Sequence, residues 1–110
     1  MLFRSGVLSA CGLLTAPLRS DFSRTCVELP PNYKLPRIAT VFSELEEQAR
    51  AWLTHEQVPR SRQQLQWAAS LRYAHQGFEL TVPWGQRTIT RNALLETIER
   101  FHVLHESLYS

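Results

Sequence analysis

The stretch SLRYAHQGFELTVP, which runs from Ser70 to Pro83, predicts a β-hairpin and decides the fold. Apolar and polar residues alternate along both arms, a period of two that is typical of strands buried on one face. With a loop at 74–77, all apolar residues of the two arms fall on the same face. A shift of one residue would destroy that agreement, so the pattern specifies the register. The predicted pairs are Tyr73 with Phe78, Arg72 with Glu79, Leu71 with Leu80 and Ser70 with Thr81.

The first arm extends upstream, since the alternation already begins at Leu65. One face of this arm is apolar, and the other carries polar or small side chains, as expected for a strand that covers a core on one side. The apolar face comprises Leu65, Trp67, Ala69, Leu71 and Tyr73, and the opposite face Gln66, Ala68, Ser70 and Arg72.

A further strand and two helices are predicted around this hairpin. The strand covers residues 23–29, and Pro30 and Pro31 end it because proline has no backbone N–H to donate. Helices are predicted over 38–56 and 91–108 from apolar residues at helical spacing, the second with Thr90 as its N-cap. The apolar stripes are Val41, Leu45, Ala49, Trp52 and Leu53 in the first helix and Leu94, Ile98, Phe101, His105 and Leu108 in the second.

The order strand, helix, strand, strand, helix predicts an α+β fold. Two amphipathic helices would cover a small antiparallel sheet that has the hairpin at its centre. The 110 residues suffice for one small domain with a single core. With 44% hydrophobic and 20% charged residues, the chain has the composition of an ordinary globular domain.

Charge and hydropathy exclude several classes of partner. The net charge of +2 comes from 12 basic and 10 acidic residues that are interspersed, so we expect no nucleic-acid surface. No segment approaches the roughly 20 apolar residues of a membrane span.

Only six residues separate Arg4 from Cys11, too few for a secretory signal peptide. Cys11 and Cys26 are therefore interpreted as free thiols, and the chain is expected to be cytoplasmic.

The most metal-like feature is His102-x-x-His105-Glu106 in the last helix. Residues three apart share a helix face, so both imidazoles could reach one metal ion. Two ligands do not make a site, however, and no third ligand is fixed nearby. The favoured interpretation is two histidines packed at the edge of the apolar stripe and hydrogen-bonded to neighbours, with a zinc site as the alternative.

Four hairpin residues, Arg72, His75, Gln76 and Glu79, are further candidates. Arg72 and Glu79 could act in catalysis, but as an opposed pair across the strands they would contribute about 0.2–1 kcal/mol to the sheet, which is the favoured interpretation. His75 and Gln76 lie at the tip, where contacts with other molecules are common. The chain has no nucleophile elbow and no glycine-rich phosphate loop, so no catalytic residue is predicted.

Three ordered stretches resemble the C-terminal part of the hydantoinase A/5-oxoprolinase family, which includes related subunits of acetone and acetophenone carboxylases. The family patterns read approximately GxxSAxGLLxAxxRxD, RYxGQxxEL and FHxxHExxYG. His75 stands where the second pattern has glycine, and the third lacks its final glycine. The matching residues are Gly6, Ser9, Ala10, Gly12, Leu13, Leu14, Ala16, Arg19 and Asp21; then Arg72, Tyr73, Gln76, Glu79 and Leu80; then Phe101, His102, His105, Glu106 and Tyr109.

The resemblance implies a C-terminal domain fragment of an ATP-dependent enzyme that opens cyclic amides or activates a ketone for carboxylation. ATP and Mg²⁺ would bind to an upstream actin-like ATPase domain, and no cofactor would bind to this part. Residues 1–20 would comprise an adapter-like cloning remnant and the last helix of that upstream domain, so that a short N-terminal helix precedes the sheet. Residues 21–110 would form the C-terminal domain, incomplete at its end.

The resemblance also implies the role and the partners of this part. It would serve packing and subunit contact, against the upstream ATPase-like domain and a hydantoinase B-type subunit, and would have no activity when isolated. The alternative is a free-standing small interaction module without catalytic activity.

Overall fold

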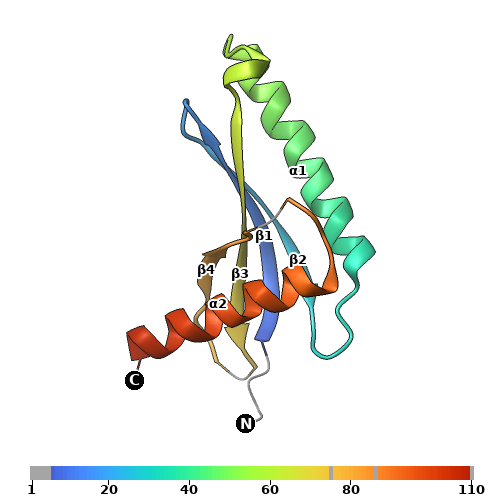
Figure 1. Ribbon diagram of the computed structural model, residues 1–110, viewed down its shortest axis with the longest axis vertical. Coiled ribbons are helices and arrows are strands. Elements are labelled where there is room, and N and C mark those ends of the chain that lie inside the picture. The colour runs from blue at the N-terminus through green and yellow to red at the C-terminus, as the bar shows by residue number, and fades with distance from the viewer. Residues whose placement is uncertain (1–5, 75, 86, 110) are drawn as a thin grey trace.

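The fold is a four-stranded antiparallel sheet with two helices, and it confirms the predicted α+β class (Figure 1). The computed structural model describes residues 6–74, 76–85 and 87–109. The sheet has the strand order β2-β1-β3-β4. Its strands are β1 (Gly6–Ala16), β2 (Asp21–Glu28), β3 (Gln64–Tyr73) and β4 (Leu80–Pro83); the helices are α1 (Leu35–His55) and α2 (Arg91–Tyr109), with a 3-10 turn at Arg60–Arg62.

The short N-terminal helix predicted within residues 1–20 is wrong. The described part of that segment forms β1, an inner strand that pairs with both β2 and β3. A register shift between Leu8 and Ala10 marks a β-bulge at this point. The bulge interrupts the alternation of buried and exposed residues, so the sequence does not show the period of a strand. Residues 1–5, which were interpreted as an adapter remnant, lie outside the described residues.

The hairpin register is confirmed where the ladder forms. Leu71 pairs with Leu80, and Ser70 with Thr81. The ladder begins only at Leu80, however, so the predicted pairs closer to the tip lie outside it. The expected pairing of Arg72 with Glu79 is wrong: the Glu79 carboxylate accepts a hydrogen bond of 2.6 Å from the hydroxyl of Ser9 on β1. Glu79 therefore joins the tip of the hairpin to the bulge of β1.

α1 lies over the sheet face that carries Trp67 and begins three residues earlier than predicted. Phe42 stacks on Trp67 with ring centroids 4.5 Å apart. At the start of the helix, the carboxylate of the buried Glu28 accepts a hydrogen bond of 2.7 Å from the backbone N–H of Lys34. This contact satisfies one of the backbone donors that a helix leaves unpaired at its N-terminus. The buried residues of α1 are Ile38, Phe42, Leu45, Ala49 and Leu53.

α2 crosses the lower part of the same face, as Figure 1 shows. The hydroxyl of Thr90 accepts a hydrogen bond of 3.1 Å from the backbone N–H of Ala93, which confirms the predicted N-cap. Leu94, Ile98 and Phe101 are buried, also as predicted, whereas Leu108 is exposed because the end of the helix projects beyond the sheet. Both helices pack on one face of the sheet, and within the described residues no helix covers the other.

Cys11 and Cys26 are free thiols on the buried face of neighbouring strands. Burial raises the pKa of both thiols above the ordinary value, and both therefore stay protonated and unreactive near neutral pH. In the part of the chain that the structure describes, no helix is long and apolar enough to cross a membrane.

Candidate functional site

Two of the three family-like motifs meet in space where the end of β3 contacts α2. The hydroxyl of Tyr73 lies 2.7 Å from Nδ1 of His102, although 28 residues separate the two in the sequence. Their rings also stack, with centroids 5.5 Å apart and planes inclined by only 9°. A hydrogen bond and a ring contact therefore link the hairpin motif directly to the helix motif.

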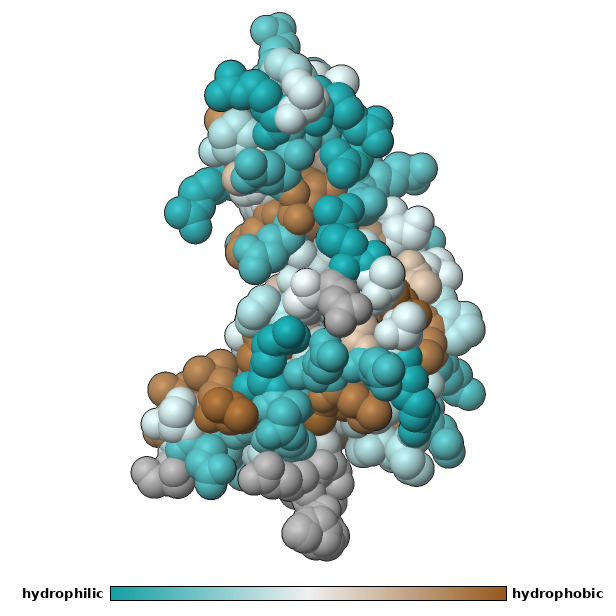
Figure 2. All heavy atoms as spheres, in the orientation of Figure 1, coloured by the Kyte–Doolittle hydropathy of each residue, from teal (hydrophilic) through white to brown (hydrophobic). Residues whose placement is uncertain are grey.

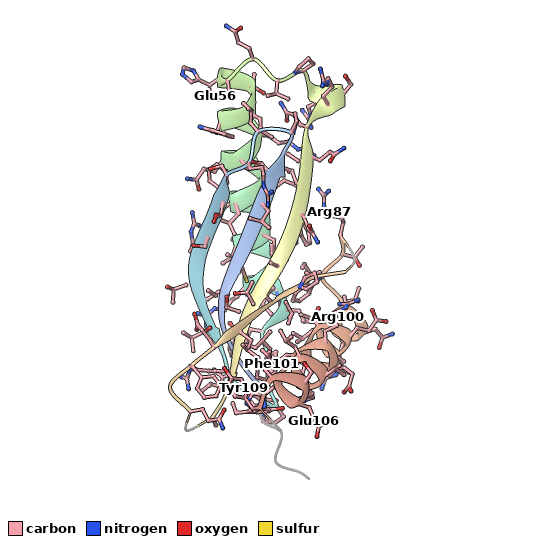
Figure 3. The ribbon with its side chains drawn as sticks, turned by 90° about the vertical axis from the view of Figure 1, so that its left-hand side faces the viewer. Glu56, Arg87, Arg100, Phe101, Glu106 and Tyr109 are labelled. Carbon is pink, nitrogen blue, oxygen red and sulfur yellow. The ribbon has the colours of Figure 1, made fainter. Side chains whose placement is uncertain are left out.

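His105 extends this contact by one turn of α2. Its ring meets Tyr73 edge-on, with centroids 4.5 Å apart, and stacks on Phe78 at 5.8 Å. Tyr109 closes the group against Phe78 at 4.7 Å. Figure 3 shows Phe101 and Tyr109 on the side of α2 that faces the strands. We call this group the hairpin–helix cluster; its members are Tyr73, Phe78, Phe101, His102, His105 and Tyr109.

The remaining candidates of the hairpin lie beside this cluster. Arg72 donates a hydrogen bond of 3.4 Å to the backbone carbonyl of Gln76, and the backbone N–H of Gln76 donates to the carbonyl of Tyr73. Arg72 therefore stabilises the tip of the hairpin instead of pairing with Glu79. His75 lies outside the described residues.

Two polar atoms in this region are buried without a hydrogen-bond partner, namely Oε1 of Gln76 and Nε2 of His105. Both residues are half-buried. An unsatisfied buried polar group costs about 1–3 kcal/mol, so such atoms call for an explanation. His105 contacts the exposed rings of Phe78 and Tyr109, so its unpaired nitrogen lies at the edge of the cluster.

The geometry supports packing for the two histidines more than metal binding. Nδ1 of His102 is already engaged by Tyr73, and the ring of His105 contacts the rings of Tyr73 and Phe78. Across residues 6–74, 76–85 and 87–109, no group of three or more His, Cys, Asp or Glu side chains is arranged to hold a metal ion. Glu106, the third member of the HxxHE motif, is exposed and points away from the strands in Figure 3.

The cluster has an apolar edge that remains open to solvent. Leu108 and Tyr109 are 56% and 54% exposed, and Phe78, whose ring packs on Tyr109, is 41% exposed. We call these three residues the apolar rim. In Figure 2, hydrophobic surface gathers at the lower left, where the end of α2 projects beyond the sheet. Contiguous exposed apolar surface of this kind is typical of sites of interaction.

Sequence reasoning missed two contacts of this site. Ser9, which binds Glu79, belongs to the first motif, but its partner could not be predicted because the motif was expected to be helical. Phe78 was expected opposite Tyr73 in a sheet ladder, whereas it lies beyond the ladder and packs against His105 and Tyr109. The alternation of the hairpin gives the correct face for Phe78 but says nothing about α2.

Comparison with known proteins gives one similar sequence. An uncharacterized protein of Methanocaldococcus jannaschii is 31% identical over 105 residues, which make up 94% of this chain and 14% of that protein. The chain thus spans about one seventh of the length of this relative. No known protein family matches the sequence, and no solved structure is significantly similar.

Proposed function

We propose that the chain is a C-terminal domain of an ATP-dependent enzyme of the hydantoinase A/5-oxoprolinase type, and that it serves packing and subunit contact. The observation that carries the proposal is the convergence of the motif residues. Tyr73 of the second motif lies beside His102 and His105 of the third, and Glu79 of the second reaches Ser9 of the first. Three separate stretches that resemble one family therefore form one continuous region.

The chemistry of this region favours contact over catalysis. Tyr73, Phe101 and His102 are packed ring against ring, so the cluster has little room for a substrate between them. Its open side is the apolar rim, next to His105, whose Nε2 has no hydrogen-bond partner. An interface typically combines apolar anchors with a few polar groups that find their partners in the complex.

The size of the similar protein also supports a role as part of a larger chain. The matching region is 14% of the M. jannaschii protein, so most of that protein lies outside the region of similarity. In the enzyme that we propose, ATP and Mg²⁺ bind to the upstream ATPase-like domain, which is the expected partner of the apolar rim. A hydantoinase B-type subunit is the second expected partner, and the location is cytoplasmic.

The 110-residue chain alone is expected to show no ATP-dependent turnover of hydantoin, 5-oxoproline or acetone. The reason is that the groups that bind nucleotide phosphates in the proposed enzyme lie in its upstream domain. Release of phosphate from ATP, measured with and without each substrate, checks this expectation. Turnover by the purified chain that exceeds a buffer blank and copurifies with it through two columns would contradict the proposal.

The alternative is a free-standing interaction module, and the same observations of the apolar rim favour it. The two proposals differ in whether an ATPase-like domain is encoded in frame before this segment. In the alternative, the partner of the rim is a separate protein.

A further inference from the structure

The sheet has a second face that carries no helix among the described residues and no charge at its centre. α1 and α2 pack on the face of Leu13 and Trp67. Figure 3 looks onto the opposite side in the upper half of the sheet, with α1 behind the strands. Antiparallel sheets that face water usually carry polar and charged side chains there. Here the central positions of three neighbouring strands are small and uncharged, and we call them the outer face: Ala10, Gly12, Ser23, Thr25, Ala68 and Ser70.

This face carries both a protrusion and a hollow. Leu14 is 45% exposed, although it lies on an inner strand. Beside it, a groove of about 270 Å³ extends over Ala10, Gly12, Ser23 and Ala68. A two-fold interface needs one surface that is complementary to itself. An apolar side chain next to a hollow lined by small residues meets that requirement.

We propose that the outer face binds the outer face of a second copy of this chain, about a two-fold axis at the level of Gly12 and perpendicular to the strands. In the sheet ladder, Leu14 lies two residues to one side of Gly12 and Ala10 two residues to the other. Rotation by 180° about this axis therefore sets Leu14 of each copy over Ala10 of the other. The large apolar side chain meets a small one, on both sides of the axis.

The neighbouring strands give the same result for the polar residues. Asp21 pairs with Leu14, and Thr25 pairs with Ala10, so the rotation brings Asp21 opposite Thr25 of the other copy. Gln66 and Ser70 are related in the same way on β3. A carboxylate thus meets a hydroxyl and an amide meets a hydroxyl, and like charges are not opposed at these positions.

The twist of the sheet agrees with this arrangement. A twisted surface that is rotated by 180° about an axis in its plane, along or across the strands, keeps the same twist. The two faces can therefore follow each other, as in aligned packing of two sheets about 10 Å apart. Small side chains at Gly12 and Ala68 allow that close approach.

The size of the face sets the expected strength of binding. β4 is only four residues long and lies on one side of the axis, so the overlap involves β1, β2 and β3. Three strands about 4.8 Å apart and about eight residues long, at about 3.4 Å per residue, form a face of roughly 400 Å². Two such faces bury about 800 Å² in total, a size typical of weak, transient interfaces. We therefore expect a reversible dimer with a Kd of roughly 10–100 µM.

Sedimentation equilibrium of the 110-residue chain from about 5 to about 500 µM tests the dimer across that range. Ala68 lies on the proposed axis and faces its own copy, so Ala68→Glu and Ala68→Lys should each weaken association at least about tenfold by opposing like charges. An equimolar mixture of the two variants should associate again, because opposite charges then face each other. Ala51→Glu, an exposed alanine on α1, is the matched control and should behave like the wild type.

Ser23 also lies on the axis and is exposed, so Ser23→Glu and Ser23→Lys repeat the test if the Ala68 variants lose their circular dichroism spectrum. The proposal would be overturned if the wild-type chain stays monomeric throughout the range. The same result is expected if another domain, and not a second copy, binds this face. Failure of the mixed Glu and Lys variants to associate would overturn it as well. The proposal concerns a different surface from the apolar rim, so its failure leaves the proposed function intact.

Discussion

Replacing Phe101 with alanine is expected to lower the free energy of unfolding by about 3–5 kcal/mol, the usual cost of removing a buried phenylalanine ring. Phe101 is only 1% exposed, and its ring packs against Tyr73, His102 and His105. Its removal would leave a cavity between α2 and the hairpin. Urea denaturation followed by circular dichroism measures the change.

Val103→Ala is the matched control for this prediction. Val103 lies on the same helix but is 61% exposed, so its truncation should change the free energy of unfolding by no more than about 0.5 kcal/mol. A Phe101 variant as stable as the Val103 variant would show that α2 is not held to the sheet by the hairpin–helix cluster.

Replacing Tyr73 with phenylalanine is expected to lower the free energy of unfolding by about 1–3 kcal/mol. The change keeps the ring and removes only the hydroxyl, which lies 2.7 Å from Nδ1 of the buried His102. The imidazole nitrogen then loses this contact while it remains shielded from water. The same denaturation experiment measures the effect, and the loss should be seen mainly as faster unfolding if α2 docks late in folding.

Tyr109→Phe separates the hydroxyl of Tyr73 from a general effect of tyrosine hydroxyls in the cluster. The ring of Tyr109 also contacts His105 but is 54% exposed, so the loss of its hydroxyl should cost no more than about 0.5 kcal/mol. Equal losses for the two variants would mean that the contact between Tyr73 and His102 does not hold the hairpin to the helix.

The hairpin–helix cluster joins the second and third motifs through direct contacts between their side chains. The hairpin supplies Tyr73 and Phe78, and α2 supplies two histidines one turn apart. His102 stacks on Tyr73, and His105 contacts both Tyr73 and Phe78. The spacing of His102 and His105, which in the sequence resembles part of a metal site, serves here to bring two imidazoles to one side of the helix. That arrangement leaves the apolar rim exposed next to the tip of the hairpin.

The sequence predicted those elements whose pattern is regular. Alternation from Leu65 to Tyr73 gave β3 and its buried face, and it gave the register with Leu80 and Thr81. The apolar stripe of α2 and its cap at Thr90 were predicted because capping and helical spacing are local properties. These features depend on residues that are close in the chain.

Features that depend on distant residues could not be predicted. The helix expected within residues 1–20 came from the family resemblance. The pattern of β1 did not reveal a strand, because the bulge near Ser9 breaks its alternation and its pairing with β3 joins residues about 60 positions apart. The partner of Glu79 is Ser9, which the hairpin alone does not bring near. The stacking of His105 on Phe78 depends on the angle at which α2 crosses the hairpin, and only the assembled core sets that angle.

The coding sequence immediately upstream of this segment in genomic DNA tests the proposed function most directly. If the chain is the C-terminal domain of a hydantoinase A/5-oxoprolinase-type enzyme, the reading frame should continue upstream into a domain with glycine-rich nucleotide-binding motifs. An in-frame stop codon followed by a ribosome-binding site just before Met1 would contradict that proposal. It would instead support the free-standing interaction module.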